Sequence, residues 1–358
     1  MRMNYKTFSV IILCVIFVYV LTIALINIVV DPFYIFRTPF LKLQAQRNDR
    51  YAKIEYLKKE NVKYNFFILG SSRMYYTRPD MLEKYIPSGK GYNLATIMAN
   101  VTEHLLHVRY LIKNGQPVKT LYIGLDIDFF FRVKTYKDQD YLLKLHPDVS
   151  STNSIAFYWS YLSIIPKGDI KRKLKANFGK KKARKIQFGK DGAVGPEVEN
   201  RQIFFDNQSK LKDIIRDKKG RENLEVLREL VVLCNQNNIN LIIFTTPHHR
   251  IIMDHFLEEE YLAFLKGLSE VTSFWDFSGY NSITTDDRNY FSFSHYTPSV
   301  SRLIAARIFD DKALHVPKDF GVWVTKDNID AHLKDLKKSF KKTISYNKEV
   351  RHLIARAN

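Results

Sequence analysis

The feature that most constrains this chain is a long apolar segment near its N-terminus. The stretch from Phe8 to Val30, "FSVIILCVIFVYVLTIALINIVV", contains no charged residue. As a helix at about 1.5 Å per residue it would span roughly 35 Å, enough to cross the hydrocarbon core of a bilayer. A cleaved signal peptide has a shorter apolar region and ends at small residues, which are absent here. We therefore predict a single uncleaved transmembrane anchor.

The charges beside this segment favour one orientation. Arg2 and Lys6 precede it, whereas Asp31 follows it directly. The positive-inside rule then predicts a single-pass membrane protein with a cytoplasmic N-terminus and an extracytoplasmic body. Cys14 lies within the predicted anchor and Cys234 within a predicted helix, so no intrachain disulfide is expected.

The rest of the chain is suited to a large folded body. Of its 358 residues, 46% are hydrophobic, which excludes general disorder. We predict the following organisation: a short tail at 1–7, the anchor at 8–30, a connector at 31–63, an α/β domain at 64–315 with a basic insertion at about 129–219, and a C-terminal helical extension at 316–358.

Strand-like and helix-like segments alternate along this body. The predicted strands are "NFFILG", "GYNLA", "KTLYIGLDI", "INLIIFTTP" and "SFWDFSG". Between and after them lie predicted helices near 79–85, 100–115, 222–238, 261–271 and 297–309, and one precedes them near 50–60. Because most of the strands are apolar on both faces, this alternation predicts a three-layer α/β fold with a parallel sheet covered by helices.

The first predicted strand ends in an unusual turn, "ILGSSR". Functional groups in parallel sheets gather where the strands end, and this turn places Gly70, Ser71, Ser72 and Arg73 there. Glycine permits a tight exit from the strand, and a serine becomes nucleophilic when a base can reach it. His295, in "FSFSHYTPSV" before the last helix of the domain, is a candidate base.

The segments "FILGSSR", "YNLA", "LYIGLD" and "FSHYT", in this order, resemble the SGNH/GDSL hydrolase superfamily. More narrowly, they are similar to its membrane-anchored members in cell-envelope modification, such as the teichoic-acid D-alanine transfer and alginate acetylation proteins. The resemblance implies a flavodoxin-like sheet and acyl-ester chemistry without a cofactor. It also implies that Ser72 is the nucleophile and contributes its N–H to the oxyanion hole, and that His295 is the base.

The chain departs from this family where the histidine is oriented. Members usually carry Asp three residues before the histidine, and this chain has Ser292 there. A serine can accept a hydrogen bond from the imidazole, but it does not stabilise imidazolium as a carboxylate does. Asp286, Asp287, Asp276 and a backbone carbonyl are alternative orienting groups.

The predicted oxyanion site departs from the family as well. Met98 or Ala99 stands where the family has glycine, and Asp126 where many members have asparagine. An ionised Asp126 would repel an oxyanion, so it must be protonated, turned away or used differently. Asn93 or Asn100 could supply a side-chain donor instead.

Three further predictions concern arginine and histidine side chains. Arg73 either binds an anionic substrate group or pairs with Asp80 or Glu83. His248 is expected at the rim, but no metal-binding motif accompanies it, and no metal site is predicted. We expect His104 and His107, three residues apart on a helix, to lie on its solvated face.

The net charge of +19 is concentrated in Lys171–Lys185, which carries nine Lys or Arg and no acidic residue. This run is either a solvated loop or a contact for anionic lipid or an anionic envelope polymer. Nucleic acid would fit only a cytoplasmic body, so no nucleic-acid partner is predicted.

Two functional hypotheses follow from the sequence. The first is a membrane-anchored extracytoplasmic esterase or O-acyltransferase that acts on acylated or hydroxylated envelope glycan or polymer. The second is a catalytically degenerate scaffold of the same fold that binds glycan or partners a membrane-bound acyltransferase. Ser292 and Asp126 are the reasons for the second.

Overall fold

The structure is a computed structural model, and it describes residues 4–38, 40–41, 43–44, 46–60, 62–86, 89–127, 141–179, 189–194, 220–254, 256 and 258–340. The chain forms two compact units. The anchor unit comprises residues 1–62 and 136–187, and the sheet unit comprises residues 63–135 and 188–358. Described parts of the predicted connector and of the predicted insertion, far apart in sequence, therefore pack in one unit.

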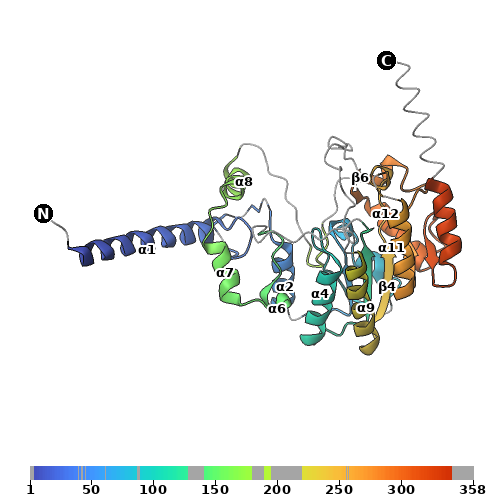
Figure 1. Cartoon of the computed structure of the whole chain (residues 1–358), viewed down its shortest axis with the longest axis horizontal. Helices are drawn as coiled ribbons and strands as arrows, with labels where there is room; N and C mark the ends of the chain where they lie inside the picture. Colours follow the sequence, from blue (N-terminus) through green and yellow to red (C-terminus); the bar gives the residue numbers. More distant parts are fainter. Residues whose placement is uncertain are drawn as a thin grey trace, which may run out of the picture. The chain divides into compact units, whose positions relative to one another are not determined.

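The anchor unit is helical in its described part. Its helices are α1 (Tyr5–Val30), α2 (Asp49–Lys59), α6 (Pro147–Ser150), α7 (Ser154–Leu162) and α8 (Lys167–Phe178), as Figure 1 shows. The predicted long apolar helix is confirmed, because α1 is long and apolar enough, by length and composition, to cross a membrane. Both α7 and α8 pack against α1. A small aromatic core, including Phe33, Tyr51 and Phe157, holds the unit together.

The sheet unit contains the α/β fold that the sequence predicts. Its sheet consists of β1 (Phe66–Leu69), β2 (Gly91–Asn93), β3 (Thr120–Leu125), β4 (Asn240–Thr245), β5 (Phe274–Asp276) and β8 (Val322–Val324). The strand order is β2-β1-β3-β4-β5-β8. The first five strands are parallel, and β8 pairs antiparallel with β5. Strand β8 falls in the C-terminal extension, for which the sequence predicts only helix.

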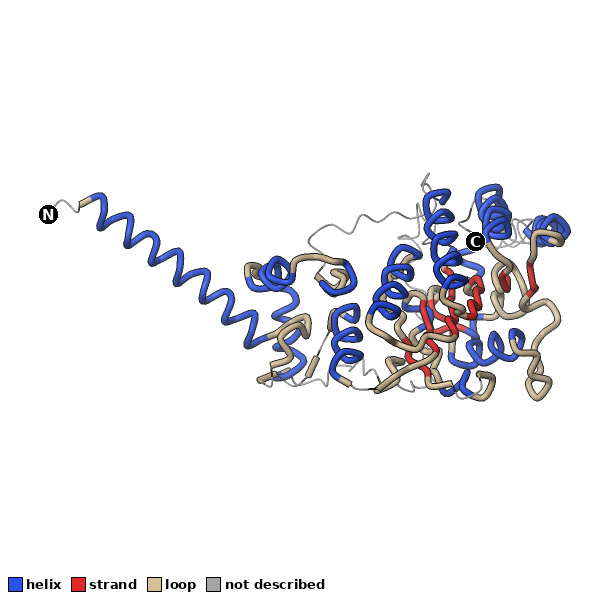
Figure 2. Tube along the Cα trace, turned by 90° about the horizontal axis from the view of Figure 1, so that it is seen from below, coloured by secondary structure: helices blue, strands red, loops and turns tan. Residues whose placement is uncertain are grey.

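Helices lie on both faces of this sheet, as Figure 2 illustrates. Phe66, Ile68, Tyr122 and Phe244 form one core with side chains of α3 (Asp80–Glu83) and α12 (Pro298–Ile308). Alternate strand residues point to the opposite face. There α9 contacts β4, and its neighbours are α4 and α11. These three helices are α4 (Val101–Lys113), α9 (Gly220–Gln236) and α11 (Glu258–Val271).

Several short elements complete the sheet unit. They are the 3₁₀ turns η1 (Ser72–Met74) and η3 (Asp287–Asn289), helix α10 (Arg250–Met253), and the hairpin of β6 (Tyr290–Ser292) and β7 (His295–Tyr296). Residues 329–340 are helical. The hairpin is not predicted by the sequence, because its strands are too short to show periodicity.

Two local predictions are wrong. The helix expected near 79–85 is reduced to the single turn α3. His104 and His107 are buried rather than solvated, because α4 is covered by neighbouring elements.

Candidate active site

The structure brings together Ser72 and His295, which lie far apart in the sequence. The Oγ atom of Ser72 lies 2.9 Å from Nε2 of His295, although 223 positions separate the two residues. Both side chains are partly exposed, so a substrate can reach them. A hydroxyl within hydrogen-bonding distance of an imidazole is the arrangement that allows a serine to be deprotonated as it attacks.

The backbone before Ser72 depends on glycine. Gly70 directly follows β1 and has a φ of +147°, a conformation that other residues rarely adopt. A Cβ atom at this position would lie 2.4 Å from Cγ of Met74 and 3.1 Å from the carbonyl oxygen of Gly124. Ser71 then caps the turn, since its Oγ accepts a hydrogen bond from the N–H of Arg73 at 3.2 Å. Ser71 is therefore a structural residue, and Ser72 is the hydroxyl that faces the imidazole.

Ser292 orients the other side of the imidazole. Its Oγ lies 3.1 Å from Nδ1 of His295 and also accepts a hydrogen bond from the N–H of Ser294 at 3.3 Å. If Nδ1–H donates to Ser292, Nε2 is left as the acceptor for the hydroxyl of Ser72. Ser72, His295 and Ser292 thus form a chain of hydrogen bonds in which a serine occupies the place of the usual carboxylate.

The alternative orienting carboxylates are engaged elsewhere. Asp286 caps η3 and pairs with Arg288 at 2.7 Å. Asp287 lies 2.9 Å from Nε2 of His249, and Asp276 is buried beside His332 at 2.7 Å. Among the candidates named from the sequence, Ser292 is the one whose contact with His295 the structure records.

Arg73 joins the serine turn to the histidine hairpin. Its Nε donates to the carbonyl oxygen of Ser294 at 2.9 Å, and its Nη2 lies 3.3 Å from the hydroxyl of the same residue. Its Nη1 forms a buried ion pair with Asp126 at 3.1 Å. The side chain is 2% exposed. Its recorded ion-pair partner is Asp126, which is neither of the acidic residues in the second predicted alternative, and Asp80 pairs with Arg78 instead. Arg73 is a positioning residue within the protein.

The carboxylate of Asp126 has two partners within the protein. The carboxylate pairs with Arg73 and accepts a hydrogen bond from the hydroxyl of Thr246, which follows β4. An adjacent cation offsets the negative charge that would otherwise repel an oxyanion. Of the possibilities that the sequence leaves open, the structure places Asp126 in the support of Arg73. The sequence did not single out Ser294 or Thr246, because the contacts of both are with residues far away in the chain.

The candidate oxyanion donors differ in their availability. Both amide hydrogens of Asn93 are donated to backbone carbonyls, those of Met74 and Thr77, at 2.8 Å. Asn93 is therefore a structural clamp. By contrast, the N–H of Ser72 and the side-chain amide nitrogen of Asn100 donate to no acceptor within the described residues, while Oδ1 of Asn100 caps α4.

Met98, in the loop before α4, has a backbone conformation that favours glycine. Its φ is +56°, in the left-handed region. A non-glycine residue there costs about 1–2 kcal/mol and persists only where the surrounding structure enforces it. The neighbouring N–H of Ala99 donates to the carbonyl of Thr96 at 3.2 Å.

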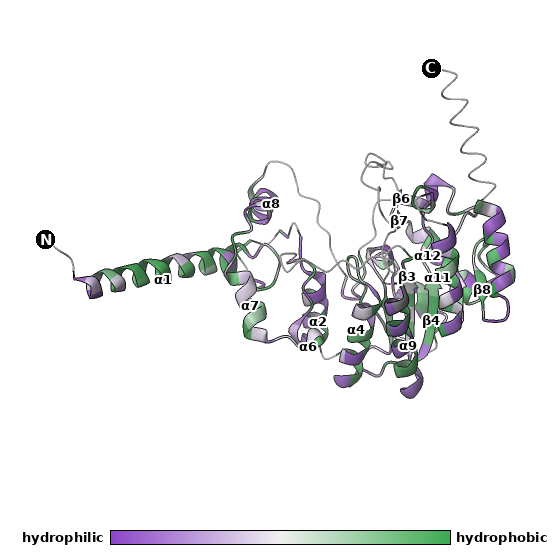
Figure 3. Cartoon of the chain, viewed as in Figure 1, coloured by the Kyte–Doolittle hydropathy of each residue, from purple (hydrophilic) through white to green (hydrophobic). Residues whose placement is uncertain are grey.

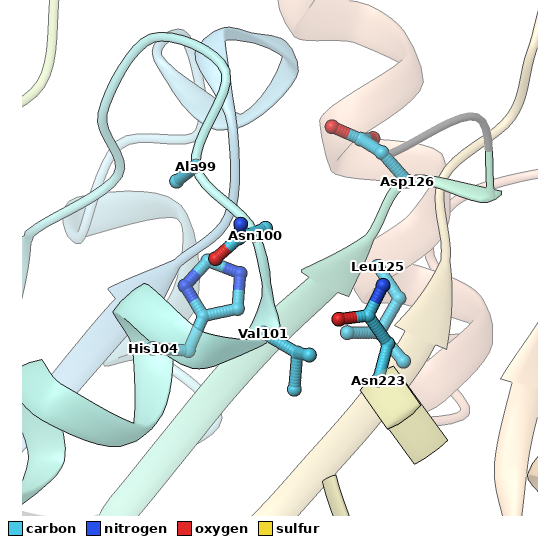
Figure 4. Close-up of a pocket in the computed structure, with 7 residues that line it drawn as sticks. All are labelled: Ala99, Asn100, Val101, His104, Leu125, Asp126 and Asn223. Atoms are coloured by element: carbon cyan, nitrogen blue, oxygen red, sulfur yellow. The ribbon is translucent and has the colours of Figure 1, made fainter. Parts of the chain in front are cut away.

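A small pocket lies between this loop and the end of β3. It is lined by Ala99, Asn100, Val101, His104, Leu125, Asp126 and Asn223, and Figure 4 displays these side chains. Three of them carry amide or imidazole groups, so the pocket suits a polar occupant such as water. It does not include Ser72 or His295.

The two histidines after β4 play separate structural roles. Nδ1 of His248 bonds to the carbonyl oxygen of Thr246 at 2.9 Å, and the ring is 1% exposed. The expectation that His248 lines an accessible rim is therefore wrong. Burial lowers the pKa of His249, and its hydrogen bond to the carboxylate of Asp287, which raises the pKa, opposes this only partly. Among the described residues, no group of three or more His, Cys, Asp or Glu is placed to hold a metal ion.

Comparisons with known proteins add no assignment to this geometry. No family model matches the chain, and no curated protein and no solved structure gives a significant match. The functional interpretation therefore rests on the contacts of Ser72, His295, Ser292 and Arg73.

Proposed function

We propose that this protein is an SGNH-like serine esterase or O-acyltransferase. The observation that carries the proposal is the 2.9 Å contact between Ser72 Oγ and His295 Nε2. The strand order β2-β1-β3-β4-β5 supports it, because this is the order of flavodoxin-like sheets. In that order the connection reverses between β1 and β3, and ligands bind beside such a reversal. Ser72 follows β1 and Asp126 follows β3, at this place.

The reaction proceeds in two acyl transfers. Ser72 Oγ attacks the carbonyl carbon of an acyl ester while its proton passes to Nε2 of His295. The imidazolium then protonates the departing alcohol oxygen, which leaves an acyl group esterified to Ser72. In the second transfer His295 takes a proton from water or from an acceptor hydroxyl, whose oxygen attacks the acyl carbon. The imidazolium then returns the proton to Ser72 Oγ as the acyl–serine bond breaks. Water as the acceptor gives an esterase, and a sugar hydroxyl gives an acyltransferase.

The N–H of Ser72 and the amide of Asn100 are the groups we assign to the oxyanion. Preorganised donors of this kind contribute about 10²–10³ in rate each. Ser292 holds the tautomer of His295 but adds no negative charge beside the imidazolium. We therefore expect a slower enzyme than one with a complete Ser-His-Asp arrangement.

The proposed substrate is an acylated or hydroxylated glycan or polymer of the cell envelope. This follows from an extracytoplasmic body, which the charges flanking α1 favour, and from the resemblance of the four sequence segments. Protease added outside intact cells would degrade the sheet unit in this orientation, and a protected sheet unit would contradict it.

The test of the chemistry is labelling by a fluorophosphonate probe. The detergent-solubilised full chain should label, and Ser72→Ala and His295→Ala should each abolish labelling. Ser71→Ala is the matched control, because Ser71 is the adjacent hydroxyl and caps a turn instead, so this variant should still label. Absence of labelling in the folded wild-type chain would favour the second function, a scaffold that binds glycan or a membrane acyltransferase, for which Ser292 in place of a carboxylate is the specific reason.

A further inference from the structure

The anchor unit exposes apolar side chains beside the end of α1. Ile155 and Trp159 on α7 are 80% and 52% exposed, and Phe178 on α8 is 75% exposed. Ile165 between these helices and Leu174 on α8 are also exposed. We name these five residues the interface patch. Single exposed apolar residues are ordinary, but α7 and α8 both pack against α1, and several such residues on and between them mark a contact surface.

The level of the patch along α1 is set by hydrogen bonds. The side-chain amide of Asn27 donates to the carbonyl oxygens of Leu162 and Ile164 at 3.2 and 2.6 Å. Asn27 lies three residues before the end of α1 at Val30, which is about 5 Å along a helix. If α1 fills a hydrocarbon core of about 30 Å, Asn27 lies near the boundary between that core and the head groups. The end of α7 therefore lies at the same depth.

The charges on α8 match an anionic surface. Lys167, Lys171, Leu174 and Phe178 follow one another at helical spacing on one exposed face, and Lys175 flanks them. Lys171 and Lys175 have no acidic partner among the described residues. Figure 3 shows the contrast between α1, which is hydrophobic along most of its length, and the largely hydrophilic α8. The rest of the basic run, residues 180–185, lies outside the described residues.

We propose that α7 and α8 lie in the head-group region of an anionic bilayer, with the interface patch in contact with lipid. Trp159 would sit at the boundary, where tryptophan is favoured, and Lys171 and Lys175 would contact lipid phosphates. A soluble anionic polymer would satisfy the lysines but would leave Ile155, Trp159 and Phe178 in water. The proposal concerns the anchor unit and does not depend on the chemistry of Ser72.

The chain offers a direct reporter, because it contains three tryptophans. In the variant Trp275→Phe/Trp323→Phe, Trp159 is the sole tryptophan. We would place this full-length variant, one chain per disc, in nanodiscs of phosphatidylglycerol with and without brominated acyl chains. The expected result is that brominated lipid removes most of the Trp159 emission while aqueous iodide has little effect. The control Trp159→Phe/Trp275→Phe keeps Trp323, which is 45% exposed in the sheet unit and should respond to iodide only.

Three outcomes would overturn the proposal. The first is Trp159 emission that brominated lipid leaves unchanged and iodide quenches. The second is a response of Trp159 to poly-glutamate instead of lipid, which would assign the patch to a soluble polyanion. The third concerns the lipid charge. Quenching of Trp159 by brominated phosphatidylcholine as strong as that by brominated phosphatidylglycerol, or unchanged quenching in Lys171→Gln/Lys175→Gln, would show that the contact does not require anionic lipid.

A second measurement covers a failure of the tryptophan variants to fold. Phe178→Cys, in a Cys14→Ser/Cys234→Ala background, can carry a spin label on α8. Its collision rate with oxygen, which concentrates in lipid, should exceed that with a water-soluble nickel chelate. Leu314→Cys on the sheet unit should give the reverse. The same preference for the chelate at both positions would contradict membrane contact.

Discussion

The guanidinium of Arg73 donates from Nε to the carbonyl oxygen of Ser294 at 2.9 Å. This bond joins the residue after the proposed nucleophile to the residue before the proposed base. Since Arg73 is also paired with Asp126 at 3.1 Å, the ends of β1 and β3 and the β6–β7 hairpin are held by one side chain. The distance between Ser72 and His295 therefore depends on a buried guanidinium that connects the two segments carrying them.

Replacement of this group should separate positioning from folding. Arg73→Lys keeps a positive charge near Asp126 but lacks the planar fork that reaches Ser294 and Asp126 together. If His295 shifts by about 1 Å, labelling by the fluorophosphonate should slow by about 10²-fold in a chain that still folds. Arg73→Met should instead destabilise the sheet unit by about 3–5 kcal/mol, because Asp126 loses its buried partner.

The control for Arg73 is Ser294→Ala. This variant keeps the backbone carbonyl that Arg73 contacts and loses only the hydroxyl at 3.3 Å. Its labelling rate should remain within a few-fold of the wild type. A wild-type labelling rate in Arg73→Lys would contradict the positioning role.

Ser292 should be replaceable by a stronger orienting group. Ser292→Ala removes the partner of Nδ1 and should slow labelling about tenfold, the effect of one lost hydrogen bond of about 1.4 kcal/mol. Ser292→Asp should label faster than the wild type, because a carboxylate stabilises the imidazolium. Asp286→Asn and Asp287→Asn, whose contacts lie elsewhere, should leave the rate unchanged. If Asp286→Asn or Asp287→Asn slowed labelling and Ser292→Ala did not, the orienting role would belong to that aspartate.

Gly70 should tolerate no side chain. Gly70→Ala introduces a Cβ atom 2.4 Å from Cγ of Met74 at a φ of +147°, and should cost about 2–5 kcal/mol from overlap and backbone strain. Gly115→Ala is the matched control, since its φ is +64° but nothing lies within 4 Å of the added atom. Gly115→Ala should lower the free energy of unfolding by about 1 kcal/mol. Urea unfolding of both variants measures the difference, and equal costs would show that packing against Met74 is unimportant.

The pair of Asp276 and His332 should make stability depend on pH. Burial raises the pKa of Asp276, but the hydrogen bond and charge of His332, with the hydroxyls of Ser278 and Thr245, outweigh it and lower the pKa. A carboxyl whose pKa is lower in the folded state stabilises above its ordinary pKa of about 4. This contribution is lost as the pH falls through the lower folded value.

His332→Ala tests this pair. It should reduce the free energy of unfolding by about 2 kcal/mol at pH 7, the value of a hydrogen bond to a buried charged group. The difference from the wild type should shrink below pH 4. Unfolding can be followed by Trp275 and Trp323 in a Trp159→Phe background, so that the signal comes from the sheet unit alone. Lys334→Ala, on the exposed face of the same helical segment, should change stability by less than about 0.5 kcal/mol. A pH-independent cost of His332→Ala would contradict the lowered pKa.

Much of the fold could be predicted because its long elements carry strong periodic signals. The sequence predicts α1 from its apolar run, the strands β1, β3 and β4 from their short apolar segments, and α4 from its amphipathic pattern. The short strands of the hairpin and β8 could not, because two or three residues have no periodicity and are formed by pairing. His104 and His107 show the same limit, since burial of a helix face depends on which neighbours cover it.

The sequence by itself determined the candidates: a serine after a glycine at the end of β1, and a histidine before α12. Only the tertiary structure decided how they are used. It brought Ser72 within 2.9 Å of His295, selected Ser292 over Asp286 and Asp287, and turned Arg73 inward to Asp126. The physical reason is that a local pattern specifies a strand end or a turn, whereas hydrogen bonds between distant residues are specified by packing of the whole sheet unit.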